Sequence, residues 1–133
     1  MTPSEAPFRH FHEQLTELNQ RLLAMSEKAE SLVELSIDAL LEKDEGKAEA
    51  VIAADVELDS MELELEAAAL ELLALQQPMA RDLRFIVSTI KVISDLERVG
   101  DHATNIAEEV IYSAQGRDVR HRHEQKKRSE EGK

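Results

Sequence analysis

Apolar residues recur along the first third of the chain with the alternating three- and four-residue spacing of a helix that buries one face. This spacing predicts a helix from about Phe8 to about Glu42. It breaks over residues 43–46, where the Asp44 carboxylate can accept a free backbone N–H and begin the next helix. So short a turn makes neighbouring helices antiparallel. The expected core positions of the first helix are Phe8, Phe11, Leu15, Leu18, Leu22, Met25, Ala29 and Leu32, continuing through Ser36 and Ala39.

The second helical segment, from residue 44 to about residue 77, has two apolar columns instead of one. The first column is the expected core seam, made of Val51, Leu58, Leu65 and Leu72 with Ala54, Met61, Ala68 and Leu75 three residues after each. The second column, Val56, Leu63 and Leu70, lies nearly opposite on the helix. A surface helix of a monomer normally buries a single stripe, so we expect this helix to be covered on two sides.

A third helix is expected from Pro78 to about Gln115, because proline suits the first turn of a helix and Gly116 suits its C-terminal cap. The sequence therefore predicts an all-α fold, an antiparallel up-down-up three-helix bundle over residues 1–116. Residues 117–133 form a charged tail that we expect to be flexible. The expected core positions of the third helix are Ile86, Ile93, Leu96, Gly100, Ala103, Ala107, Val110 and Ala114.

The composition and charge of the chain limit the partners and the compartment that we expect. The 133 residues are 42% hydrophobic and 33% charged, which suits one domain. The net charge is −12 although residues 117–133 hold seven Lys and Arg against four Asp and Glu, so the helical body is strongly acidic. Such a surface repels nucleic acids and anionic membranes, and neither is an expected partner. The sequence has no cysteine, no signal-peptide pattern and no apolar window of membrane length. We therefore expect the protein in the cytoplasm.

Two acidic pairs with the same four-residue spacing, Asp55/Asp59 and Glu97/Asp101, lie at mirrored positions about Pro78. Residues four apart share one patch of a helix. A hairpin folded about Pro78 would therefore bring four carboxylates to one level of the bundle. Gly100 lies at that level, and a glycine inside a helix costs about 1 kcal/mol relative to alanine. A close helix contact or a crowded ligand patch would explain it.

Four clustered carboxylates repel one another, and a cation is their natural compensator. Oxygen ligands favour magnesium, calcium, manganese or iron, with zinc less expected. Glu62 and Glu108 extend the patch as secondary candidate ligands, so more than one ion could bind. The alternative is a solvated face, because 28 acidic residues on helices produce many such pairs by themselves.

An enzyme is not expected. The serines and threonines of the third helix have no evident histidine partner, and the chain has no glycine-rich phosphate loop. The Glu-x-x-His spacing of di-iron bundles is also absent from the sequence. A metal-dependent hydrolase or oxidase therefore remains the least supported reading.

One segment of the chain reads QQPMARDLRFIVSTIKVISDLERVGDHATNIAEEV. It resembles the PhoU family of phosphate-transport accessory and regulatory proteins, and the resemblance extends over about residues 8–120. The family hallmark, ERxGD followed by isoleucine five residues later, comes after a QxP-x-x-x-DLR hairpin. The second helix supplies the other acidic motif, Asp55 and Asp59. The hallmark residues here are Glu97, Arg98, Gly100, Asp101 and Ile106, preceded by Gln76, Pro78, Asp82, Leu83 and Arg84.

This resemblance implies multinuclear metal binding through the acidic motifs and negative control of phosphate uptake and phosphate-responsive signalling. It implies contacts with the phosphate transporter's ATPase and with a sensor histidine kinase. Family members usually carry two such repeats where this chain has one, so we expect two copies to associate as a homodimer, using the second apolar column among other surfaces. The alternative from another class is a structural helical interaction module without metal or regulatory chemistry.

Overall fold

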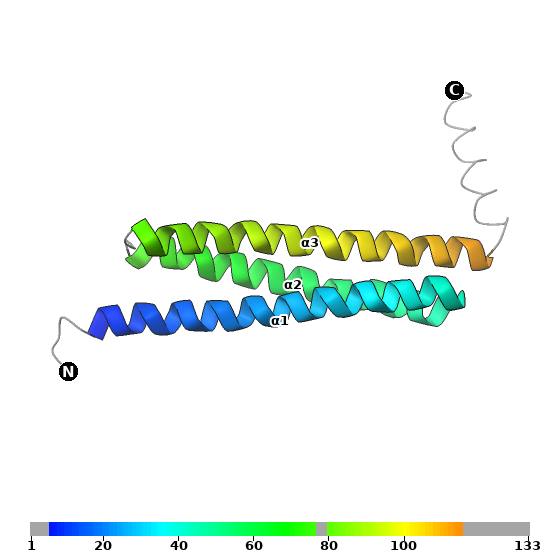
Figure 1. Cartoon of the computed structure of the whole chain (residues 1–133), viewed down its shortest axis with the longest axis horizontal. Coiled ribbons are helices and arrows are strands. Elements are labelled where there is room, and N and C mark those ends of the chain that lie inside the picture. Colours follow the sequence, from blue (N-terminus) through cyan, green and yellow to red (C-terminus); the bar gives the residue numbers. More distant parts are fainter. Residues whose placement is uncertain (1–5, 77–79, 116–133) are drawn as a thin grey trace, which may run out of the picture.

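Three long helices lie side by side in the computed structural model, which describes residues 6–76 and 80–115 (Figure 1). They are α1 (Ala6–Glu42), α2 (Glu45–Gln76) and α3 (Ala80–Gln115). Helices α1 and α3 run in the same direction, and α2 runs antiparallel to both (Figure 1). The predicted up-down-up bundle is therefore confirmed. The predicted bounds agree closely, although Pro78 and Gly116 lie outside the described residues. No described helix is both long enough and apolar enough to cross a membrane.

The turn between α1 and α2 uses the predicted cap. The Asp44 Oδ1 atom accepts a hydrogen bond from the Lys47 backbone N–H at 3.1 Å, and the Asp44 N–H donates to the Ala39 carbonyl at 3.0 Å. The second bond closes α1 with a Schellman-type turn, in which Lys43 takes a positive φ of 54°. A non-glycine residue in this conformation is strained, so the turn is specified by its hydrogen bonds at some cost.

Heptad positions from all three helices meet along the bundle axis to form the core. Leu18 and Met25 of α1, Leu58 and Leu65 of α2, and Ile93 of α3 are almost fully buried, as their spacing predicted. Ala114 was predicted to be buried but is exposed, because the last buried residue of α3 is Val110 and its final turn extends past the core. The remaining buried apolar residues are Phe11, Ala29, Leu32, Ala39, Ala48, Val51, Ala69, Leu72, Ile86, Ala103 and Ala107.

The second apolar column of α2 is not covered within one chain. Val56, Leu63 and Leu70 expose 67%, 69% and 50% of their surface. Helix α2 therefore has one apolar face in the core and another apolar face turned outward.

Candidate metal centre

The antiparallel packing of α2 against α3 brings the two predicted acidic pairs together. Asp55 and Glu97 are half-buried, whereas Asp59 and Asp101 are exposed at the edge of the same contact. The charges of Asp59 and Asp101 act on both half-buried groups, and Asp55 also acts on Glu97. The four carboxylates therefore form one electrostatic cluster, as the mirrored spacing predicted.

The tightest group within this cluster consists of Asp59, Glu62 and Glu97. One carboxylate oxygen from each lies within 4.8 Å of the others. Cations held by oxygen at about 2.0–2.6 Å place ligand oxygens up to about 5 Å apart, so this spacing suits a single ion. Glu62, a secondary candidate in the sequence, thus belongs to this group, whereas Asp55 and Asp101 do not. The other secondary candidate, Glu108, is exposed and also outside it.

Asp55 has a buried carboxylate oxygen that makes no hydrogen bond with the described residues. This atom is Oδ1, and the Oγ1 atom of Thr104 is likewise buried without a hydrogen-bond partner in the part of the chain that the structure describes. Burial raises the pKa of Asp55, as does the charge of Asp59. The nearby Thr104 hydroxyl lowers this pKa in part, but the two oxygens do not meet hydrogen-bond geometry. A buried carboxylate oxygen left unpaired is costly, and a cation or a proton would relieve it.

Burial and neighbouring negative charges also raise the pKa values of Glu62 and Glu97. The pKa of Glu62 is raised first by burial and then by the charges of Glu97 and Glu66. The pKa of Glu97 is raised by burial and by Asp101 and Asp59, and the charge of Arg98 offsets this only in part. The residues therefore fit a hard cation, since the donors are oxygens and their mutual repulsion disfavours the metal-free charged state.

Gly100 allows the two helices to approach at this point. A Cβ atom at position 100 would collide with the Leu58 side chain and would lie 2.7 Å from Asp55 Oδ1. Real Cβ atoms essentially never come that close to another atom. The predicted close helix contact is therefore confirmed, and it lies beside the Asp55 carboxylate.

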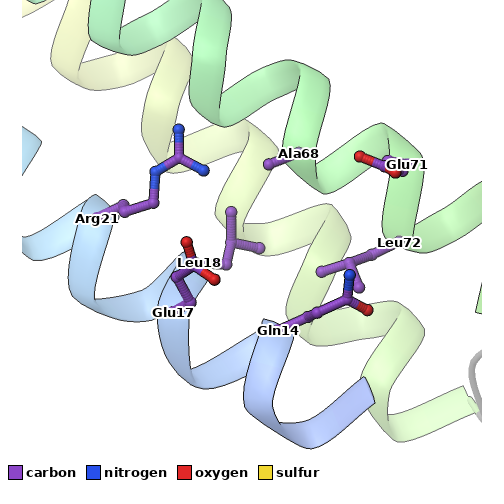
Figure 2. Close-up of a pocket in the computed structure, with 7 residues that line it drawn as sticks. All are labelled: Gln14, Glu17, Leu18, Arg21, Ala68, Glu71 and Leu72. Carbon is purple, nitrogen blue, oxygen red and sulfur yellow. The ribbon is translucent and has the colours of Figure 1, made fainter. Parts of the chain in front are cut away.

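The hollow between α1 and α2 is a separate feature (Figure 2). Its volume is about 200 Å³, below the roughly 300–1,000 Å³ typical of small-molecule sites. None of the clustered carboxylates lines it. The lining residues are Gln14, Glu17, Leu18, Arg21, Ala68, Glu71 and Leu72. We therefore place the candidate chemistry at the α2–α3 contact.

Comparison with known proteins agrees with this fold. A family model described as the PhoU domain matches residues 22–110. A phosphate-specific transport system accessory protein PhoU homolog from Clostridium acetobutylicum is 43% identical over 101 residues, which is 75% of this chain and 46% of that protein. The homolog from Pseudomonas putida is 40% identical over 77% of this chain and 40% of its own length.

A solved structure is similar as well. The crystal structure of PhoU from Pseudomonas aeruginosa matches with a TM-score of 0.77 and 35% sequence identity, covering 79% of this chain and 50% of that chain. The chain thus spans about half the length of the relatives it matches.

Proposed function

Because this chain belongs to the PhoU family, we propose that it is a metal-binding adaptor that restrains phosphate uptake and phosphate-responsive signalling through protein contacts. Its relatives carry the name of accessory proteins of the phosphate-specific transport system. The observation that carries the proposal is the carboxylate cluster between α2 and α3, with its unpaired Asp55 oxygen, in a chain that has the family fold.

Asp59, Glu62 and Glu97 would hold the first ion, with Asp55 and Asp101 beside it for a second. Divalent or trivalent ions such as iron, manganese or magnesium suit these oxygen donors, with zinc less favoured. A bound cation would neutralise the cluster and tie α2 to α3. Its role in this proposal is to fix the surface that partners recognise, and no reaction is assigned to it.

The partners in this proposal are those implied by the family resemblance, namely the ATPase of a phosphate transporter and a sensor histidine kinase in the cytoplasm. Two copies of the chain associate in this proposal, and the outward apolar column of α2 offers a surface for that contact. In a host lacking this protein we expect faster uptake of labelled phosphate, restored to normal by the wild-type chain. Unchanged uptake in that host would refute the regulatory role.

Elemental analysis of the purified protein tests the metal. The variant Asp59→Asn/Glu97→Gln keeps the shape of two ligands and should lose most of the metal that the wild type carries. The control Glu57→Gln/Glu64→Gln removes the same charge from the α1 side of α2, where both acids form ion pairs, and should keep the metal. Equal metal content in all three proteins would refute the assigned ligands.

The second candidate function is a helical interaction module that needs no metal. The outward apolar face of α2 favours it, because exposed large side chains in one column are typical of contact surfaces. A wild-type protein that is purified without metal, and whose stability does not change on adding manganese or magnesium, would support this reading over the first.

A further inference from the structure

The outward face of α2 carries a regular stripe of seven exposed residues. Val56, Leu63 and Leu70 form its large column, at 67%, 69% and 50% exposure. Small residues lie between them, so the spacing alternates between three and four residues over 22 residues, or about 33 Å of helix. This is the pattern of a coiled-coil seam. The outer stripe consists of Ala53, Val56, Ser60, Leu63, Ala67, Leu70 and Ala74, and all seven are exposed.

We propose that two copies of this chain pair through the outer stripe with their α2 helices antiparallel. This inference deepens the two-copy association in the proposed function by assigning its surface and orientation. The seven residues of the outer stripe are exposed in the single chain, so neither bundle has to open. A symmetric dimer requires one surface that complements itself.

The sequence of the outer stripe has this self-complementarity only in one orientation. One column is entirely small and the other entirely large. Antiparallel pairing places a small residue opposite a large one in six layers and leaves only Ala74 beyond the paired span, whereas parallel pairing would stack Leu on Leu and leave gaps at the alanines. The layers are Ala53 with the partner's Leu70, Val56 with the partner's Ala67, and Ser60 with the partner's Leu63, each occurring twice.

The acidic row on the α1 side of the outer stripe fixes the register. Lys28 Nζ lies 2.6 Å from Glu57, and Arg21 lies 3.6 Å from Glu64. In the register given above, Glu57 faces the partner's Glu64. Each of these two carboxylates already forms an ion pair with a basic side chain of its own α1. A shift by one heptad towards the C-terminal end of α2 would oppose Glu57 to the partner's Glu71, and a shift in the other direction would keep only four of the six layers. Among the ion pairs of the described residues, Glu71 has none, so the shifted register leaves a repulsion uncompensated.

The row on the α3 side, Asp59 and Glu66, remains acidic. In the antiparallel dimer each of these faces the other in the partner, and like charges so placed weaken pairing. We therefore expect the dimer to tighten as salt rises from about 0.05 M to about 0.5 M, because screening removes this repulsion and leaves apolar burial unaffected. A basic partner helix would show the opposite salt dependence.

The small–large alternation of the outer stripe supports a second copy as the occupant. Such a stripe is complementary to an antiparallel copy of itself, whereas a single unrelated helix would not require this alternation.

Light scattering on the full chain tests the pairing. At about 100 µM, a concentration that would populate even a micromolar dimer, the wild type should have twice the chain mass of 15.0 kDa. Leu63→Glu should return it to one chain mass and keep its helical circular dichroism, since Leu63 is exposed in the single chain. The control Leu41→Glu, at a residue of α1 that is 76% exposed, should stay dimeric. A monomeric wild type, or a dimeric Leu63→Glu, would overturn the proposal.

Cross-linking tests the orientation, and the absence of cysteine from the sequence makes introduced cysteines unique. Ala53→Cys mixed with Leu70→Cys should cross-link through a short bis-maleimide. Ala53→Cys alone should not, because positions 53 of the two copies lie about 26 Å apart along an antiparallel pair. Cross-linking of the single variant with itself would overturn the orientation.

Metal analysis of the same samples separates this inference from the proposed function. Metal bound to a monomeric wild type would refute the pairing and leave the metal-binding adaptor intact. A metal-free dimer would support the pairing and count against the metal centre.

Discussion

Replacing Gly100 with alanine adds one methyl group where α3 lies directly against Leu58 and Asp55 of α2. Two effects oppose each other. Alanine should stabilise a helix interior by about 1 kcal/mol relative to glycine. The new methyl group would collide with the Leu58 side chain and lie 2.7 Å from Asp55 Oδ1, so the helices must separate or both side chains must move.

Extra methyl groups forced into packed interiors usually cost about 1–3 kcal/mol. The upper part of this range applies at Gly100, because Leu58 is fully buried and has little freedom to move. After subtraction of the gain in helix propensity, we expect the variant to be less stable by about 1–2 kcal/mol. With a urea dependence of about 2 kcal/mol per molar, its unfolding midpoint should fall by about 0.5–1 M.

The measurement is urea unfolding followed by helical circular dichroism, with a chelator present so that only packing is compared. Asn105→Ala on the exposed side of α3 is the matched control, since it gains helix propensity without a new contact and should be stabilised by a few tenths of a kcal/mol. If Gly100→Ala were stabilised as much as this control, the close approach of the two helices would be refuted.

Three further predictions concern the cluster and the turn. Asp55→Asn should stabilise the metal-free protein at pH 7, because the folded-state pKa of Asp55 is raised by burial and by Asp59; the stabilisation should disappear as pH falls towards the ordinary value of 3.8, where wild-type Asp55 is also neutral. Urea unfolding at several pH values checks this, and a gap that widens on acidification would contradict the assigned direction. Manganese added to chelated wild type should raise the thermal midpoint, whereas Asp59→Asn/Glu97→Gln should not respond; equal shifts in differential scanning fluorimetry would rule out these ligands. Lys43→Gly should stabilise the protein by about 0.5 kcal/mol, because glycine tolerates the positive φ of 54°; Lys43→Ala serves as the control without that relief, and equal unfolding midpoints for the two variants would refute the strain.

The heptad spacing was sufficient to predict the helices and most of the core, because burial in a three-helix bundle depends on one stripe per helix. It failed at Ala114, since a repeat in one helix does not reveal where its neighbours end. Spacing also missed Thr89, which is buried because its hydroxyl donates to the Phe85 carbonyl at 2.9 Å and so needs no other partner.

The carboxylate cluster was predictable in outline and not in detail. Mirrored pairs about a hairpin specify that four residues face one contact. Which oxygens come within 4.8 Å of one another depends on how far each helix is rotated and on side-chain rotamers, neither of which spacing fixes. Glu62 therefore joined Asp59 and Glu97 in the tightest group, while the half-buried Asp55 lay deeper beside Gly100.

The faces of α2 connect the two proposals. Its buried stripe fills the core, its outer stripe is apolar and exposed, and the acidic edge towards α3 lies between them. Asp59 belongs both to the carboxylate cluster and to the edge that faces the partner's Glu66 in the proposed dimer. A cation held by Asp59 would therefore remove a negative charge from the pairing surface. Linkage requires the converse, so pairing would strengthen the binding of that cation by the same factor.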